Sequence, residues 1–345
     1  MEKLDLTSHE AIQRPFPFYK FMREQLPVHW NPSLKGWFVS RFADVQAALM
    51  NQDLSVEKMS GFGERDHGAL QDKIATLTEV IGGWMVFKDP PDHTRLRKVM
   101  QPAFLPSKIE KLRPKIEAVS EQLLQKVAEK HKREGQVDLI WDYAFPLPAI
   151  VVGELCGVPA HEAERLKYWA DNIGKFVLQG RATPDKYDRS YHALVECVAF
   201  YQDLVTKERK LRSDNLIGRM IESSGLDTPL SDDEIVSMLV LLLFAGHETT
   251  TNLIANGMLA LMQHPEQLEL LQSDLSLVES AVEEFLRFEG PAAVVVRIAK
   301  KPMEIGGEKI AEGERVFLGL NAADHDPARF ADPHRLKVPR PGRKH

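Results

Sequence analysis

The chain has 345 residues, of which 43% are hydrophobic, and a formal net charge of −6. This is the composition of a globular protein with enough chain for a large core. The acidic balance argues against nucleic acid as the main partner, because basic residues carry most of the affinity for a phosphate backbone. The two cysteines, Cys156 and Cys197, lie far apart in apolar stretches with no CxxC pair. They predict buried thiols and not a disulfide framework or a zinc site.

No stretch approaches the roughly 20 apolar residues that a membrane-spanning helix needs, so we expect no membrane span. The N-terminal stretch MEKLDLTSHEAIQRPFPF contains acidic side chains and has no apolar central region. It therefore does not have the pattern of a signal peptide. Together these observations predict a soluble, cytoplasmic protein.

The first elements in chain order are short. Residues 27–40 predict a strand, a turn and a second strand, and residues 41–51 predict a helix. Residues 60–86 are rich in glycine and polar side chains, which predicts a long loop with room for a short helix. From residue 91 to about 224 nearly every segment has helical periodicity, interrupted at prolines.

The clearest predicted element is a helix that starts after Ser231 and ends at His264. Ser231 and Glu234 have the spacing of a capping box, and about thirty residues at 1.5 Å each give a helix of about 45 Å. A further helix is expected in residues 275–288, followed by short strands in residues 293–320 and a loop-like tail. The sequence therefore predicts a mainly α protein with a minor β-sheet (α+β), in which both ends of the chain supply strands to a single domain spanning residues 1–345.

The stretch LLLFAGHETTTN lies inside the long helix and combines apolar residues with polar ones. His247 and Glu248 begin an HExxH zinc motif, but Thr251 stands where the second histidine ligand belongs, which excludes a zinc protease here. The chain also has no Walker loop and no GxSxG motif, and GFGERD lacks the third glycine of a dinucleotide fingerprint.

Two interpretations of this stretch remain open on its residues alone. In the first it is a core helix whose threonines bond back to carbonyls of the preceding turn. In the second, Gly246 admits a flat cofactor or a diatomic ligand, and Glu248 and Thr249 bring a proton source and a hydroxyl beside it. The second interpretation gives a reason for Gly246, which in mid-helix costs about 1 kcal/mol relative to alanine.

The motif AGHET in a long helix resembles the oxygen-binding helix of the cytochrome P-450 family. The family's ExxR motif matches Glu284-Phe-Leu-Arg287; the bare pattern occurs four times in the chain, but only EEFLRFEGP follows the AGHET helix by about 35 residues and precedes a proline. DPPDHTRLRKVMQPAF, VVVRIA and NAADHDPARFADPHRLKVPR are similar to further family segments, in the family's order. The chain is identified as a member of this family, of the soluble bacterial type.

The resemblance implies a role for each matching residue. Glu248 would relay protons and Thr249 would steady bound oxygen, in a groove formed by Ala245 and Gly246. Residues expected to bind the haem propionates are His93, Arg97, Arg297 and His345. The expected structural network consists of Glu284, Arg287 and Arg340; the first two lie three residues apart and therefore share a helix face.

The chain departs from the family at its C-terminal end. The segment FGxGxHxCxG, with the cysteine thiolate that activates haem iron, is absent, and family spacing would place that cysteine roughly ten residues beyond His345. Neither Cys156 nor Cys197 has its context. We therefore expect a chain truncated before the ligand loop and the final helix, with the apolar flank of the Asp232–Met262 helix left uncovered.

Two hypotheses follow from this departure. One is a haem-thiolate monooxygenase seen as a truncated chain; the other is a haem-free, catalytically inactive remnant. The intact pair Glu248 and Thr249 disfavours a peroxygenase. By resemblance the cofactor is haem b, the electron donor is a ferredoxin or flavodoxin, and the substrate is an apolar small molecule bound by residues 60–87, 242–245 and 292–296.

Overall fold

The computed structural model describes residues 5–178, 185–211, 213, 215–222 and 229–340. The chain divides into two compact units. Unit 1 takes in both ends of the chain, Met1–Lys58 and Leu253–His345, and unit 2 is the continuous segment Met59–Asn252. The sequence prediction of a single domain stays a prediction.

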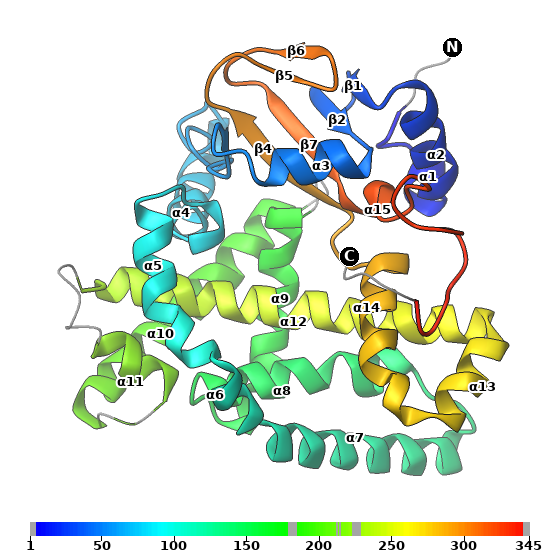
Figure 1. Ribbon diagram of the computed structural model, residues 1–345. Coiled ribbons are helices and arrows are strands. Elements are labelled where there is room, and N and C mark those ends of the chain that lie inside the picture. Colours follow the sequence, from blue (N-terminus) through cyan, green and yellow to red (C-terminus); the bar gives the residue numbers. More distant parts are fainter. Residues whose placement is uncertain (1–4, 179–184, 212, 214, 223–228, 341–345) are drawn as a thin grey trace. The chain divides into compact units, whose positions relative to one another are not determined.

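Unit 1 combines two sheets with short helices, as shown by the blue and orange ribbons of Figure 1. Its described elements are α1 (His9–Gln13), α2 (Pro15–Gln25), β1 (Val28–Asn31), β2 (Gly36–Val39), α3 (Phe42–Leu49), β3 (Leu54–Ser55), α13 (Pro265–Ser273), η7 (Leu275–Leu277), α14 (Val278–Glu289), β4 (Val294–Ala299), β5 (Met303–Ile305), β6 (Glu308–Ile310), β7 (Arg315–Gly319) and α15 (Leu320–Ala323).

The larger sheet joins the two ends of the chain. Its strand order is β1-β2-β7-β4-β3, with β2 parallel to β7 and the other neighbours antiparallel. Trp37 of β2 is paired with Val316 of β7, and Gly36 stands where a Cβ would lie 2.7 Å from the carbonyl oxygen of Arg315. Strands β5 and β6 form a separate pair. The predicted minor sheet with strands from both chain ends is confirmed.

The core of unit 1 follows from the alternation of its strand residues. Val39, Val316 and Leu318 are fully buried on the sheet and pack together in one apolar cluster. Phe38 points away from that cluster into a second one with Tyr19 and other residues of α2, because successive strand side chains face opposite sides.

Unit 2 is helical in its described part. Its elements are η1 (Gly68–Leu70), α4 (Gln71–Gly82), η2 (Met85–Phe87), α5 (Asp92–Met100), η3 (Gln101–Phe104), α6 (Pro106–Glu110), α7 (Arg113–Glu134), η4 (Ile140–Ala144), α8 (Pro146–Leu155), η5 (Ala160–Glu162), α9 (Ala163–Leu178), α10 (Lys186–Leu211), α11 (Leu216–Ile221) and the larger part of α12 (Asp232–Gln263).

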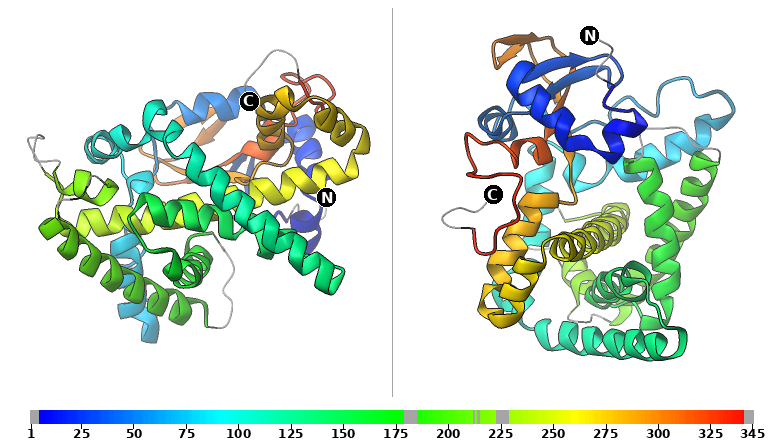
Figure 2. Two further views of the ribbon diagram at one scale, coloured as in Figure 1. Left: turned by 90° about the horizontal axis from the view of Figure 1, so that it is seen from below. Right: turned by 90° about the vertical axis from the view of Figure 1, so that its right-hand side faces the viewer.

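Helix α12 is the long predicted helix, and it is unbroken from every side in Figures 1 and 2. Its start is the predicted capping box: the Ser231 N–H donates to Glu234 Oε2 at 2.9 Å, and the Glu234 N–H donates to Ser231 Oγ at 3.2 Å. Leu239, Val240 and Leu243 are fully buried in a core that also contains residues of α4, α8, α9 and α10. The apolar first half of the helix is therefore core, as predicted.

The sequence prediction for residues 60–86 is wrong in part. This segment contains the twelve-residue helix α4, which buries Ile74, Leu77 and Ile81. Their spacing of three and four residues is helical, but glycines and polar residues on both sides obscure it in the sequence.

The expectation that no stretch is apolar enough for a membrane span was too strict. Helix α12 is long and apolar enough to cross a membrane, with a mean hydropathy of 1.3 over its most apolar 18 residues. This is weak evidence for a span, because the core helix of a soluble protein can have the same length and hydropathy.

Candidate functional site

The acidic residue of the AGHET motif lies against helix α9. Glu248 is half-buried, and its carboxylate oxygen Oε2 occupies the space beside Gly174 of α9, where a Cβ would lie only 2.9 Å away. Burial raises the pKa of Glu248, and the negative charge of Asp171 raises it further. This carboxyl therefore keeps its proton at a higher pH than an ordinary glutamate, which suits a group that delivers protons.

The hydroxyl next to it is held by its own helix. Thr249 is exposed, and its Oγ1 donates to the Ala245 carbonyl oxygen at 2.7 Å. Thr251 makes the same kind of bond to the His247 carbonyl oxygen at 2.9 Å, but it is buried. The threonines thus bond back to the preceding turn, as in the core-helix interpretation, and Thr249 alone of these two is accessible to a ligand.

Gly246 faces the side chain of Val152 in helix α8. A Cβ at this position would lie 2.6 Å from Cγ2 of Val152 in α8. Close packing of two helices is therefore one structural reason for glycine here. The approach of a cofactor, expected from the sequence, stays a prediction. Ala245 is half-buried and packs against the core of unit 2.

His247 is a residue whose environment the sequence interpretation did not anticipate. Its side chain is 2% exposed, and its ring lies 4.1 Å from that of Phe145. Burial lowers the pKa of His247 to about 4, although a hydrogen bond with the backbone of Phe145 acts to raise it. Its Nε2 atom is buried without a hydrogen-bond partner among the described residues. This histidine is neutral at neutral pH, and a zinc role was already excluded by Thr251.

His93 and Arg97 lie on α5 of unit 2, four residues apart and therefore on one helix face. His93 is half-buried and Arg97 is exposed. Within the described residues neither side chain makes an ion pair, so both are available to an anionic group.

Arg297 lies in the middle of β4 in unit 1 and donates through Nη1 to the Val296 carbonyl oxygen at 3.1 Å. Its charge acts on Lys58, which the sequence interpretation missed: burial lowers the pKa of Lys58, and the positive charge of Arg297 lowers it further. Two neighbouring cations in a half-buried place fit an anion such as a carboxylate. Because Lys58 and Arg297 are far apart in the chain, no sequence pattern pairs them. The fourth propionate candidate, His345, lies outside the described residues.

The structure brings Glu284, Arg287 and Arg340 together in unit 1. Arg287 donates through Nε to Glu284 Oε2 at 2.8 Å and through Nη2 to Oε1 at 2.9 Å. Arg340 approaches the same carboxylate, with Nε 2.8 Å from Oε2 and Nη2 3.0 Å from Oε1. The side chains of Glu284 and Arg287 are 1% and 2% exposed, so this is a buried charge network.

The network also fixes the backbone of the following segment. Arg287 Nη1 donates to the carbonyl oxygens of Asp324 and Pro333, at 2.8 and 2.9 Å. Burial alone would raise the pKa of Glu284, but the hydrogen bonds from Arg287 and Arg340 outweigh it, so the pKa is lowered. The carboxylate stays charged and anchors residues 324–340 to α14.

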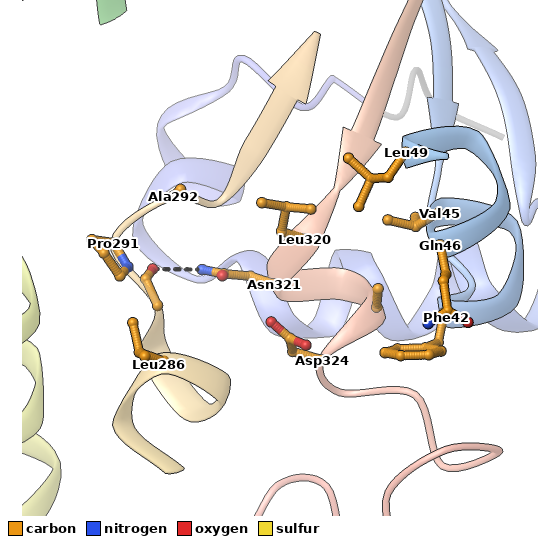
Figure 3. Close-up of a pocket in the computed structure, with 12 residues that line it drawn as sticks. Phe42, Val45, Gln46, Leu49, Leu286, Pro291, Ala292, Leu320, Asn321 and Asp324 are labelled. Carbon is orange, nitrogen blue, oxygen red and sulfur yellow. Dashed lines mark hydrogen bonds between the residues drawn. The ribbon is translucent and has the colours of Figure 1, made fainter. Parts of the chain in front are cut away.

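Unit 1 also contains an apolar pocket of about 330 Å³ that the sequence interpretation did not identify. In Figure 3, side chains of α3 face α15 across it, and the link after α14 closes a third side. Asn321 Nδ2 donates to the Gly290 carbonyl oxygen at 3.3 Å. Burial raises the pKa of Asp324 to about 7, although the positive charge of Arg287 acts to lower it. Of the residues expected to bind the substrate, Ala292 lines this pocket.

Neither cysteine fits the axial ligand of a haem-thiolate protein. Cys156 and Cys197 are fully buried in the apolar core of unit 2. Burial raises the pKa of Cys156 to about 12 and that of Cys197 well above its ordinary value. Both are therefore inert thiols, and neither fits the thiolate ligand of a haem.

Known proteins match the chain over nearly its whole length. The family profile described as Cytochrome P-450 matches residues 67–344. The chain is 36% identical over 343 residues to the Vitamin D(3) 25-hydroxylase of Pseudonocardia autotrophica, covering 98% of this chain and 80% of that protein. It is 33% identical over 340 residues to the biotin biosynthesis cytochrome P-450 of Bacillus subtilis (strain 168), covering 98% and 83%.

Solved structures give the same result. CalO2 superimposes with a TM-score of 0.88 at 29% identity, covering 99% of this chain and 83% of that one. P-450 BioI, in complex with an acyl carrier protein ligated to hexadec-9Z-enoic acid, superimposes with a TM-score of 0.87 at 31% identity, covering 97% and 85%. The α+β fold expected from the sequence is therefore the fold of these proteins, and the chain belongs to the cytochrome P-450 family, whose members are haem monooxygenases.

Proposed function

We propose that this protein inserts one oxygen atom from O₂ into an apolar small molecule as a haem-dependent monooxygenase. The observation that carries the proposal is the pair Glu248 and Thr249 in the middle of α12. A half-buried carboxyl with a raised pKa stands directly before an exposed hydroxyl. Such a pair holds and passes protons, which a monooxygenase needs when it splits O₂.

The protein's own residues would act as follows. Glu248 holds a proton on its carboxyl and passes it toward the Thr249 hydroxyl. The Ala245 carbonyl accepts the hydrogen bond of that hydroxyl at 2.7 Å and so orients it. When bound, haem supplies the redox chemistry. His93, Arg97, Arg297 and Lys58 are proposed to bind its propionates.

The substrate class is inferred from apolar side chains. In unit 2, Phe244 stacks on Trp84 with ring centroids 5.1 Å apart, and Trp84 stacks on Phe87 at 5.8 Å. These rings belong to the segments expected to bind the substrate, and they favour an apolar molecule. Two relatives, a vitamin D(3) hydroxylase and a protein solved with a fatty-acyl carrier protein, are consistent with this class. We propose a ferredoxin or flavodoxin as electron donor and the cytoplasm as location.

The test is Thr249→Ala in a chain extended by the cysteine-containing segment FGxGxHxCxG, loaded with haem and supplied with an electron donor. We expect haem content to be unchanged and reducing equivalents to be diverted from product to hydrogen peroxide, because the hydroxyl is lost. The measurement is the ratio of product formed to NAD(P)H consumed. Thr251→Ala is the matched control, since it removes the same kind of hydrogen bond from a buried position. An unchanged ratio in Thr249→Ala would contradict the proposal.

A second candidate function is a haem-free protein without oxidative activity. The observation that favours it is the burial of both cysteines, neither of which fits the axial ligand. Haem content of the purified protein separates the two candidates: protein that neither carries nor takes up haem supports the inactive alternative.

A further inference from the structure

Helix α9 contains a glycine where helix propensity disfavours one. Gly174 lies in the interior of α9, where glycine costs about 1 kcal/mol relative to alanine, and it is buried. A Cβ at Gly174 would lie 2.9 Å from Glu248 Oε2 and 3.5 Å from Cε2 of Phe244. The absent side chain therefore leaves the space in which the Glu248 carboxyl lies.

The same face of α9 carries an acid one turn earlier. Asp171 precedes Gly174 by three residues, so both positions face in the same general direction. Asp171 is half-buried, and burial raises its pKa against the opposing charges of Lys167 and Lys175. Its negative charge acts in turn on Glu248.

The two lysines that act on Asp171 have contacts of their own. Lys167 lies 4.2 Å from the ring centre of Trp141 and 4.4 Å from that of Phe145, and Lys175 Nζ donates to Asn172 Oδ1 at 3.2 Å. On α12 itself, His247 is buried and neutral. None of the ion pairs within the described residues involves Glu248, so Asp171 is the charged group with a resolved influence on it.

We propose that α9 positions Glu248 for proton transfer: Gly174 leaves room for its carboxyl, and Asp171 lies one turn before Gly174 on the same side of the helix. Gly174 and Asp171 are positioning residues, since they act through Glu248. The inference rests on the proposed role of Glu248 in proton delivery. It adds two residues of a different helix that no family motif in the sequence marks.

The test is a titration of the Glu248 carboxyl by NMR of protein labelled with ¹³C at glutamate Cδ, with Glu248→Gln used to assign the signal. In Gly174→Ala the new methyl group displaces the free end of a flexible side chain, so we expect the fold to be kept and the carboxyl to move toward solvent. Its titration midpoint should fall by about one pH unit, and Asp171→Asn should lower it by a similar amount.

Two further variants separate positioning from general damage. Gly153→Ala is the matched control: it places a methyl group 3.2 Å from Cδ1 of Leu166, away from Glu248, and should leave the titration unchanged. In Gly174→Ala/Glu248→Asp the shorter side chain no longer meets the methyl group. With ¹³C at aspartate Cγ, the titration midpoint at position 248 should therefore be close to that in Glu248→Asp alone.

A Glu248 midpoint that is the same in the parent, Gly174→Ala and Asp171→Asn would overturn the inference. If Gly174→Ala fails to fold, this contradicts the claim that the added methyl group meets only a movable side chain. Asp171→Asn then still tests whether the charge of Asp171 acts on Glu248. The titration needs no haem and no turnover. Its failure is therefore distinct from failure of the proposed monooxygenase activity, which the product ratio of Thr249→Ala reports.

Discussion

At the scale of single residues, the two neighbours His247 and Glu248 show how burial controls charge in the middle of α12. Burial disfavours the charged form of each, so it lowers the pKa of the histidine and raises that of the glutamate. Both groups are therefore neutral over a wider pH range than in water. Over that range each side chain avoids the desolvation cost of a buried charge.

His247 makes unfolding depend on pH. Its pKa is about 4 in the folded protein and 6.5 for an ordinary, solvated histidine. Below pH 6.5 the unfolded chain therefore binds a proton at this position, whereas the folded chain does not. Stability is therefore lost as pH falls from 6.5 to about 4, by about 3 kcal/mol in total. We expect His247→Gln to reduce this loss, measured as the difference in free energy of unfolding between pH 7 and pH 4.5.

The matched control is His131→Gln, an exposed histidine on α7. It should leave the difference between the two pH values as it is in the parent. Equal pH dependence of the parent and His247→Gln would show that the buried imidazole is not the group responsible.

The sequence predicts Glu248 and Thr249 as site residues, but it gives no sign of Val152 beside Gly246, of Gly174 and Lys58, or of the burial of His247. The first two stand in a motif of adjacent residues. The others depend on which side chain another helix or strand brings opposite them, such as Val152 opposite Gly246. A single sequence does not contain that pairing, because it is fixed by packing.

At the scale of elements, the buried network that joins α14 to residues 324–340 is a strong tie. We expect Arg287→Leu to lower the free energy of unfolding by about 3–5 kcal/mol, because it leaves the Glu284 carboxylate buried with a partner missing. The measurement is chemical denaturation, with limited proteolysis of residues 320–340 as a local readout.

The chain supplies its own control for this experiment. Glu110 and Arg113 have the same ExxR spacing and an Nε to Oε1 distance of 2.6 Å, but their side chains are 64% and 63% exposed. Arg113→Leu should leave stability close to that of the parent, because water screens an exposed ion pair. Similar losses in both variants would mean that burial does not distinguish the two pairs.

Gly246 allows α12 to pack closely against α8. We expect Gly246→Ala to destabilise the protein by about 1–3 kcal/mol, because Cγ2 of Val152 stands 2.6 Å from the added methyl group. Gly246→Ala/Val152→Ala should recover much of the loss, as measured by thermal unfolding. Gly82→Ala, whose methyl group would lie 3.7 Å from Cβ of Met59, serves as the control and should be close to neutral.

Helices and strands were the part of the fold most accessible to sequence reasoning. The capping box at Ser231 and Glu234 and the strands around Trp37 follow local patterns, and both are present. Helix α4 is longer than the short helix that the sequence allows, because its three buried residues lie among glycines and polar side chains. Which strands pair was only partly predictable: the two chain ends were expected to share a sheet, but the parallel register of β2 on β7 has no local signal.

At the scale of the whole molecule, the two cysteines decide what these 345 residues do with haem. We expect the reduced protein with added carbon monoxide to lack the Soret band of a thiolate-ligated haem, since both thiols are buried in the core and their pKa values are raised. Cys156→Ser and Cys197→Ser should leave the absorption spectrum unaltered. A thiolate band that disappears in one of these variants would identify that cysteine as the ligand after all.

The end of α12 that belongs to unit 1 is apolar and accessible. Met258, Leu259 and Met262 are 36%, 49% and 67% exposed. Exposed apolar side chains on one helix face favour association with other apolar surfaces. We expect the purified protein to self-associate, and Leu259→Lys/Met262→Lys to reduce the associated fraction in sedimentation velocity runs. An associated fraction that the double variant leaves unchanged would assign the association to another surface.

The pairing of β2 with β7 sets an order of events during synthesis on the ribosome. Trp37 and Val316 are partners, and about 280 residues of chain separate them. At translation rates of about 5–20 residues per second, the N-terminal strands wait for tens of seconds before their neighbour emerges. The continuous segment Met59–Asn252 is complete before then, whereas the edge of β2 stays open. The nascent chain therefore has a period in which an unpaired strand is available to chaperones, and in which a pause in translation would prolong its exposure.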